Sequence, residues 1–127
     1  MLHSVLVVDD NDGTRALLTD ALRLAGYDTI AAENGAHGVR RLVEFKPCVI
    51  LLDLNMPVMD GHDFHEVQKS IAPDVPVVCI TGSATDEQSA RRVGASACHL
   101  KPIDIQALCA TIADLCARVH THAEPAR

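Results

Sequence analysis

The chain has no excess of positive charge and no long apolar run, and each absence narrows what it can do. Its 127 residues include 11 Lys and Arg against 17 Asp and Glu, which gives a formal net charge of −6. Because nucleic-acid binders release counterions with a basic patch, direct nucleic-acid binding is not expected. No segment is apolar over the length of a membrane span, and no basic region precedes an apolar one at the N-terminus. We therefore expect a cytoplasmic protein without membrane insertion or a secretory signal.

The chain also lacks paired cysteine motifs. Its five cysteines form an odd set without a CxxC pair. Most lie in apolar segments, where cysteine behaves as a small buried hydrophobe, and a reducing cytoplasm suits free thiols. Nothing in the sequence indicates a thiol with a lowered pKa, so a redox sensor is not expected. The five residues are Cys48, Cys79, Cys98, Cys109 and Cys116.

The composition that remains is typical of a folded domain. Hydrophobic residues make up 48% of the sequence and charged residues 22%, a balance that favours a globule over disorder. The length suits one domain with its own core and is too short for two ordinary domains. We expect this domain to span residues 1–120, with a polar C-terminal tail at 121–127.

Short aliphatic runs alternate with helical segments along the chain. Three runs are nearly continuous: SVLVV at Ser4–Val8, CVILL at Cys48–Leu52 and VPVVCI at Val75–Ile80. Such runs are typical of parallel strands buried on both faces. Two weaker runs, Asp28–Ala32 and Ala97–Leu100, are expected at or near the sheet edges. Strands alternating with helices predict an α/β fold, a three-layer doubly wound domain around a parallel sheet.

Helical spacing, caps and stop signals predict five helices. The first cap is expected at Asp12 or Thr14, and later caps at Asn34 and Asp104. The fourth helix is short and has a narrow apolar face, so we expect it to be marginal. The expected helices are Thr14–Ala25, 35–45, Gly61–Ser70, Asp86–Val93 and 105–119.

Polar residues follow the ends of four of the expected strands. Asp9 and Asp10 follow the first strand, Asp53 the third, Thr81 the fourth and Lys101 the fifth. Ligands of such sheets bind beyond the carboxyl ends of the strands, so these side chains should converge. Three close carboxylates repel unless a cation joins them, and an all-oxygen site suits Mg²⁺. Each residue alone could be a helix cap, but together the set fits phosphoryl transfer.

Four segments resemble a known family: VLVVDDN, ILLDLNMPVMDG, CITGS and GASACHLKP. The second is the most specific, because it joins a strand-end aspartate to Met-Pro and Met-Asp-Gly. Across Ser4 to Val119 the chain resembles the receiver domain of two-component response regulators. The resemblance implies a flavodoxin-like (βα)5 fold whose five-stranded parallel sheet has the order 2-1-3-4-5. It also implies a phosphorylation-controlled switch that takes its phosphoryl group from a sensor histidine kinase or a phosphotransfer protein.

The resemblance further implies the roles of individual residues. Asp53 would accept the phosphoryl group and take part in holding Mg²⁺. Asp10 would bind Mg²⁺ directly, Asp9 mostly through water, and Asn55 through its backbone carbonyl. Such a domain catalyses only its own phosphorylation and dephosphorylation, so it is not classed as an enzyme. The downstream partner is not indicated by the sequence.

The expected output face departs from the family pattern. Lys101 would contact the phosphoryl group, and Thr81 would move toward it on activation. Three residues before this lysine the family commonly has Tyr or Phe, which turns inward when the threonine moves. Here the position is occupied by Cys98, which His99 follows. The chain has no Trp, only one Tyr and two Phe, so it offers no obvious aromatic residue to take the place of this ring. The expected fourth helix is also short. We therefore expect the domain to control its downstream partner through a surface that differs from the one the family commonly uses.

A second interpretation of the first loop leads to an enzyme. Residues 10–14 spell a DxDGT motif, which resembles the nucleophile loop of haloacid-dehalogenase-type phosphatases. Asp10 would then be the nucleophile and Asp12 the general acid and base, with Thr81 and Lys101 binding phosphate. This alternative lacks a later acidic pair after a strand, has no room for a cap domain and leaves DLNMPVMDG unexplained. A receiver-like scaffold that is never phosphorylated is a third hypothesis, disfavoured by the intact acidic set.

Overall fold

Strands and helices alternate along the chain as the apolar pattern predicts. The structure, a computed structural model, describes residues 3–54, 61–82 and 94–123. The expected helix Asp86–Val93 and the expected ligand Asn55 lie outside the described residues. The described elements are β1 (Ser4–Val8), α1 (Asp12–Leu24), β2 (Asp28–Ala32), α2 (Gly35–Phe45), β3 (Val49–Asp53), α3 (Gly61–Ile71), β4 (Val77–Thr81), β5 (Ala97–Leu100) and α5 (Ile105–Ala123).

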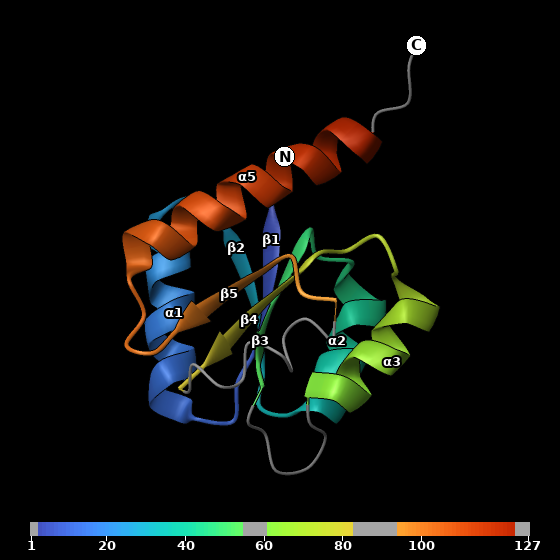
Figure 1. The fold of residues 1–127 in the computed structure, drawn as a ribbon, viewed down its shortest axis with the longest axis horizontal. Coiled ribbons are helices and arrows are strands. Elements are labelled where there is room, and N and C mark those ends of the chain that lie inside the picture. The colour runs from blue at the N-terminus through green and yellow to red at the C-terminus, as the bar shows by residue number, and fades with distance from the viewer. Residues whose placement is uncertain (1–2, 55–60, 83–93, 124–127) are drawn as a thin grey trace.

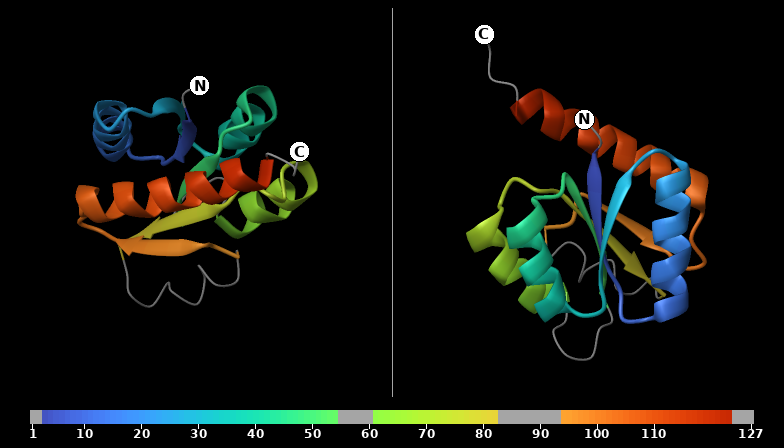
Figure 2. Two further views of the ribbon diagram at one scale, coloured as in Figure 1. Left: turned by 90° about the horizontal axis from the view of Figure 1, so that it is seen from above. Right: turned by 180° about the vertical axis from the view of Figure 1, so that it is seen from behind.

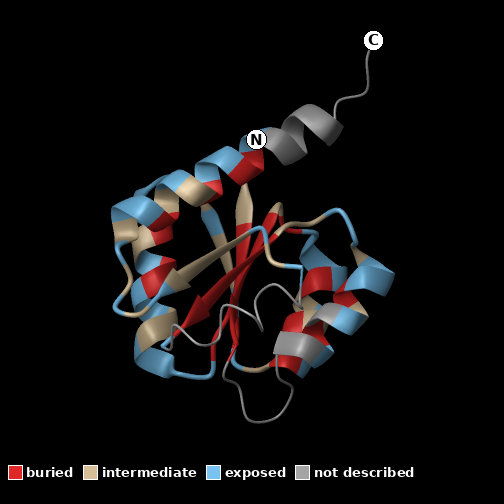
Figure 3. Ribbon diagram, in the orientation of Figure 1, coloured by how far each residue is buried: buried red, intermediate tan, exposed pale blue. Residues whose placement is uncertain are grey.

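All five strands form one parallel sheet. Its order is β2-β1-β3-β4-β5, which confirms the predicted flavodoxin-like topology. Helices α1 and α5 cover one face of the sheet, and α2 and α3 cover the other (Figures 1 and 2). The three central strands are almost entirely buried (Figure 3), because helices cover both of their faces.

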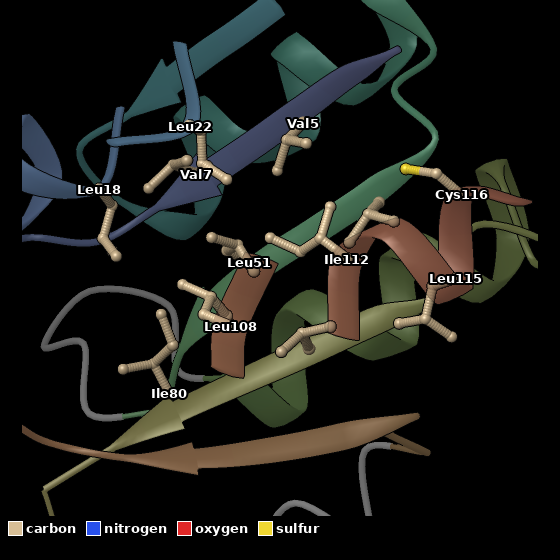
Figure 4. Packing of buried hydrophobic residues seen from close by; sticks show 12 residues of the cluster. Val5, Val7, Leu18, Leu22, Leu51, Ile80, Leu108, Ile112, Leu115 and Cys116 are labelled. Carbon is tan, nitrogen blue, oxygen red and sulfur yellow. The ribbon is translucent and has the colours of Figure 1, made fainter. Parts of the chain in front are cut away.

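Alternate residues of each central strand enter two separate apolar clusters. In β1, Leu6 and Val8 belong to the cluster under α2 and α3, while Val5 and Val7 belong to the cluster under α1 and α5. Figure 4 shows the second cluster from close by. This division follows from the two-residue period of a strand, whose successive side chains point to opposite faces. The two clusters hold the central strands in one register, and that register decides which residues meet at the carboxyl edge.

Strands β3 and β4 end one residue later than predicted, and this draws two polar residues into the sheet. Asp53 is the last residue of β3 and pairs with Ile80, and Thr81 is the last residue of β4 and pairs with Leu100. β4 also starts two residues later than expected, at Val77. The preceding residue, Pro76, has no N–H to donate to the ladder, although its carbonyl accepts from the Ile50 N–H at 3.0 Å.

The first helix begins earlier than predicted because its cap is a different residue. The side chain of Asn11 accepts a hydrogen bond from the Thr14 N–H at 2.8 Å, so the expected cap at Asp12 or Thr14 is wrong. Asn11 has extended backbone angles, and Asp12 already lies in the first turn. The predicted caps at Asn34 and Asp104 are confirmed, since their side chains accept from backbone N–H groups three residues later.

The last helix is longer than predicted. α5 continues to Ala123, so residues 121–123 of the expected tail are helical, and residues 124–127 lie outside the described part of the chain.

Gly38 lies where α2 approaches β1 and α3 closely. A Cβ at this position would lie 2.9 Å from Phe64 Cε2 and 3.0 Å from Val8 Cγ2. An alanine elsewhere in a helix stabilises it by up to about 1 kcal/mol relative to glycine. We expect Gly38→Ala instead to lower the free energy of unfolding by about 1–2 kcal/mol, because the overpacked neighbours must shift. Urea denaturation measures this difference.

Gly13→Ala is the matched control for this substitution. Its Cβ would meet only Asn11 Oδ1, at 3.4 Å, in the exposed first turn of α1. We expect this variant to be as stable as the natural chain or slightly more so. A Gly38→Ala variant that is as stable as Gly13→Ala would contradict the close packing of α2 on β1 and α3.

Candidate functional site

Adjacent strands bring three carboxylates together at the carboxyl edge of the sheet. Asp9 follows β1, and its backbone N–H donates to the Ala32 carbonyl at 3.1 Å, which keeps it in line with the sheet. Asp53 ends β3, the neighbour of β1, so both side chains are buried at the same edge. Asp10 is exposed beside them. One oxygen from each of the three carboxylates lies within 4.8 Å of the others.

One oxygen of Asp9 is buried without a hydrogen bond. Asp9 Oδ1 accepts from the Asn11 N–H at 2.9 Å, but Oδ2 is inaccessible to solvent and has no hydrogen-bond partner. Leaving a buried charged acceptor unsatisfied costs more than an ordinary hydrogen bond contributes. Lys101 Nζ lies 3.9 Å from this atom, too far to hydrogen-bond to it, so a metal cation bound there would satisfy it. The donor set of carboxylate oxygens is the type that Mg²⁺ prefers.

Lys101 brings a positive charge close to two of these carboxylates. Its Nζ lies 3.8 Å from Asp53 Oδ2 and 3.9 Å from Asp9 Oδ2, which are ion-pair distances too long for hydrogen bonds. The backbone N–H of Lys101 donates to the Thr81 carbonyl at 2.8 Å and so fixes the end of β5 against the end of β4. One ammonium cannot balance three carboxylates, so the site keeps a negative field that attracts a divalent cation.

The last residue of β4 is followed by an exposed glycine. Thr81 is fully buried within the sheet, but the residue after it, Gly82, is exposed, and a Cβ there would meet nothing within 4 Å. The predicted residues Asp9, Asp10 and Asp53 are therefore gathered by the structure, with Lys101 beside them and Thr81 at the end of the adjacent strand. The fourth predicted ligand, Asn55, is outside the described residues.

Asp12 does not join this group. Its side chain is exposed and pairs with Arg15 within the first turns of α1, and it is absent from the carboxylate cluster found among the described residues. The DxDGT residues therefore do not act together, because Asp10 faces the cluster while Asp12 belongs to the helix start. Sequence reasoning missed Arg15, whose guanidinium also donates to the Asp9 carbonyl at 2.8 Å. The spacing of Asp12 and Arg15, three apart on a helix, was the available signal.

The two atypical residues of β5, Cys98 and His99, contact opposite sides of the sheet. Cys98 is half-buried against the apolar cluster under α2 and α3. His99 reaches the other side of the sheet, where its Nε2 lies 3.0 Å from Thr111 Oγ1 on α5. The Thr111 hydroxyl donates its one hydrogen to the Ala107 carbonyl at 3.1 Å, so it accepts from His99, which carries its proton on Nε2. This bond connects the strand that precedes Lys101 directly to α5.

Comparison with known proteins identifies the family. The family model of the response regulator receiver domain matches residues 5–113 of the chain. The chain belongs to this family. Receiver domains are phosphorylation-controlled switches of two-component signal transduction, so membership gives the class of function. The fold, the strand order and the acidic edge all agree with it, whereas nothing supports the phosphatase alternative with Asp10 as nucleophile.

Individual relatives agree with the family model. Over 107 residues the receiver domain is 33% identical to sporulation initiation phosphotransferase F of Bacillus subtilis, covering 83% of this chain and 86% of that protein. It is 35% identical over 116 residues to the transcriptional regulatory protein PrrA of Mycobacterium tuberculosis, covering 90% of this chain and 50% of PrrA. The chain spans about a quarter to a half of the length of the first curated relatives it matches.

A solved structure shows the same fold. The chemotaxis protein CheY4 of Vibrio cholerae superposes with a TM-score of 0.82 at 29% identity, covering 91% of this chain and 99% of that one. Within the described part of the receiver domain, no helix has both the length and the apolar character needed to cross a bilayer.

The acidic edge predicts a stabilising response to Mg²⁺. At about 100 times its dissociation constant, an ion that binds only the folded state stabilises it by about 2.7 kcal/mol. We expect Mg²⁺ to raise the melting temperature of the natural domain, and Asp10→Asn to lose most of this rise because one ligand charge is gone. Differential scanning calorimetry with and without Mg²⁺ measures the effect.

Asp12→Asn is the matched control, since it removes an exposed carboxylate two residues away that lies outside the cluster. It should keep the full rise in melting temperature with Mg²⁺. An equal rise in Asp10→Asn and Asp12→Asn would show that the cluster does not hold the ion.

Proposed function

We propose that Asp53 of this receiver domain accepts a phosphoryl group and that Mg²⁺ assists the transfer. The observation that carries the proposal is the place of Asp53 at the end of β3, with a carboxylate oxygen 3.8 Å from Lys101 Nζ and two further carboxylates within 4.8 Å. A carboxylate alone at a buried strand end would be a cost to the fold. Together with a cation and a metal site, it becomes a nucleophile for phosphoryl transfer.

The proposed donor is a phosphohistidine of a sensor histidine kinase or of a phosphotransfer protein. An oxygen of Asp53 attacks the phosphorus, the bond from phosphorus to the histidine nitrogen breaks, and the nitrogen keeps the electron pair. The product is an acyl phosphate on Asp53 and, because the other ring nitrogen of the phosphohistidine carries a proton, a neutral imidazole on the donor. Lys101 balances charge on the phosphoryl oxygens, and the hydroxyl of Thr81 donates to one of them after it moves from its place in β4. These roles extend to this chain the pattern of the family to which it belongs.

Asp9, Asp10 and Asp53 are the residues that would hold Mg²⁺. The buried Oδ2 of Asp9 has no hydrogen-bond partner, and all three side chains offer carboxylate oxygens within 4.8 Å of one another, which fits a hard cation. When bound, Mg²⁺ supplies positive charge against the phosphoryl oxygens. The carbonyl of Asn55 stays the predicted fourth protein ligand.

The domain acts on no substrate other than itself in this proposal. It catalyses its own phosphorylation and slow dephosphorylation, and it controls a downstream protein whose identity the chain does not indicate. We place it in the cytoplasm because its five cysteines form an odd set without a CxxC pair, a pattern that suits a reducing compartment. Its formal charge of −6 argues against direct contact with nucleic acid.

Output in this proposal passes through β5 to α5 without an aromatic residue. A shift of Thr81 toward the phosphoryl group disturbs the bond between its carbonyl and the Lys101 N–H, at the end of β5. Two residues earlier on the same strand, His99 is hydrogen-bonded to Thr111 of α5. A movement of the strand end therefore reaches α5 through a polar contact, where the family commonly uses a rotating ring at the position of Cys98.

Phosphorylation with a small donor tests the proposed nucleophile. We expect the chain to form a stable acyl phosphate with acetyl phosphate and Mg²⁺, and Asp53→Asn to abolish it because the attacking oxygen is replaced by an amide nitrogen. Intact-protein mass spectrometry measures the added phosphoryl group. Asp12→Asn is the control and should be phosphorylated at the natural rate, since its side chain lies outside the site.

The phosphatase alternative predicts the opposite pattern. Steady turnover of a phosphate ester that survives Asp53→Asn but is lost in Asp10→Asn would contradict the switch. If no small donor or kinase phosphorylates the natural chain, the third hypothesis, a receiver-like scaffold that is never phosphorylated, would be favoured.

The contact between His99 and Thr111 predicts a variant that separates phosphorylation from output. We expect Thr111→Val to be phosphorylated at the natural rate but to lose at least half of the amide chemical-shift change that beryllofluoride and Mg²⁺ produce in the first half of α5. Nuclear magnetic resonance measures these shifts. Thr19→Val is the control, because the Thr19 hydroxyl bonds only to the Ala16 carbonyl of its own helix, α1. Natural shift changes in Thr111→Val would rule out this route to α5.

A further inference from the structure

A second group of ligand atoms lies at the amino-terminal ends of the strands, opposite the end where the carboxylates lie. His3 precedes β1, Cys48 precedes β3, and Cys116 lies on α5. Figure 4 shows the sulfur of Cys116 pointing from α5 toward the chain that leads into β3. A ring nitrogen of His3 and the sulfurs of the two cysteines all lie within 4.8 Å of one another. Neither the family's chemistry nor the proposed phosphorylation uses these residues.

Backbone hydrogen bonds hold two of the three ligand positions in place. The Cys48 N–H donates to the Ser4 carbonyl at 2.9 Å, and the His3 carbonyl accepts from the Asp28 N–H at 2.9 Å. Both bonds continue the pairing of β1 with its neighbours β3 and β2. Cys116 is buried in the cluster between α5 and the sheet. The two residues that precede strands are therefore tied to the sheet by backbone hydrogen bonds, and the third lies on the helix that packs on it.

We propose that His3, Cys48 and Cys116 bind a Zn²⁺ ion, with water as the fourth ligand. Thiolate sulfur and imidazole nitrogen are the ligands that zinc prefers in proteins, and three protein ligands with one open position form a common zinc geometry. Two sulfurs at about 2.3 Å from a tetrahedral ion lie roughly 3.8 Å apart. The sulfurs of Cys48 and Cys116 are 3.0 Å apart, so they must separate by less than about 1 Å.

The two thiols share a hydrogen bond with their sulfurs 3.0 Å apart. Hydrogen bonds from Cys116 and from His3 lower the pKa of Cys48 to about 6, although its partial burial acts in the opposite direction. The sequence expectation of cysteines without a lowered pKa is therefore wrong for Cys48. The pKa of Cys116 is raised, because its thiol donates to Cys48 and is buried. A bound metal ion deprotonates a coordinating thiol outright, so zinc would replace this shared hydrogen bond with two metal bonds.

A disulfide between the same cysteines is the competing occupant of this cluster. It would require the sulfurs to close from 3.0 Å to about 2.05 Å and would leave His3 without a role. The convergence of a third ligand atom on the pair favours the metal. Zinc at this point would join the segment before β1, the segment before β3 and α5, although the two cysteines are 68 residues apart in the chain.

Cobalt binding tests the proposal, with Co²⁺ as the spectroscopic probe for the zinc site. We expect the reduced natural chain to bind one equivalent of Co²⁺ with the near-ultraviolet absorption of cobalt–thiolate charge transfer, and one equivalent of Zn²⁺ to remove this absorption. Ions held by the carboxylates of the phosphorylation site have oxygen ligands only and give no such band. Cys48→Ser, Cys116→Ser and His3→Ala should each weaken Co²⁺ binding at least tenfold.

Cys109→Ser is the matched control, because Cys109 lies on the same helix about two turns before Cys116 and outside the cluster. It should keep the natural affinity. His3→Ala is the variant least expected to unfold the chain, since it leaves both thiols and the buried Cys116 unchanged. No thiolate band in the reduced natural chain, or an unchanged band in both Cys48→Ser and Cys116→Ser, would overturn the proposal. So would a reduced chain that binds no Co²⁺ but forms the Cys48–Cys116 disulfide with peroxide.

Discussion

Three carboxylates repel one another at the carboxyl edge of the sheet, and the burial of the apolar strands keeps them close together. The rest of the structure depends on this constraint. Asp9 and Asp53 follow or end the adjacent strands β1 and β3, whose other residues are almost fully buried. The strands cannot separate to relieve the charges without exposing both apolar clusters. Lys101 reaches them at 3.8–3.9 Å but cannot balance the full charge. The domain therefore keeps an edge at which binding a cation relieves an unfavourable state.

Helix α5 contacts residues from both ends of the parallel strands. In its first half, Thr111 accepts a hydrogen bond from His99 of β5, the strand that leads to Lys101 beside the carboxylates. Five residues further along the helix, Cys116 meets Cys48 and His3 at the opposite end of the strands. A change in the carboxylate cluster and a change in the thiol cluster would therefore both act on the packing of one helix. Because that helix lies on the sheet through an apolar face, small shifts can move it without breaking the core.

The sequence predicted the features that depend on local pattern and on parallel topology. Continuous aliphatic runs specified the strands, and parallel strands necessarily bring Asp9, Asp10 and Asp53 to one edge. It could not specify which residue caps α1, because Asn, Asp and Thr are all good caps and the choice depends on where the strand backbone turns. It also missed the contact of Cys48 with Cys116, because the two lie far apart in sequence and no spacing motif connects them. The lowered pKa of Cys48 follows chiefly from that contact, with a further contribution from His3.

The most direct measurement is the position of the phosphoryl group within the chain. Borohydride reduces an acyl phosphate on aspartate to homoserine, which tandem mass spectrometry of peptides then locates at a single residue. After phosphorylation in the presence of Mg²⁺, the account predicts homoserine at position 53, where Asp53 ends β3. Homoserine at position 10 would contradict it, because the nucleophile would then lie in the first loop and the acidic pair would not serve as a metal site.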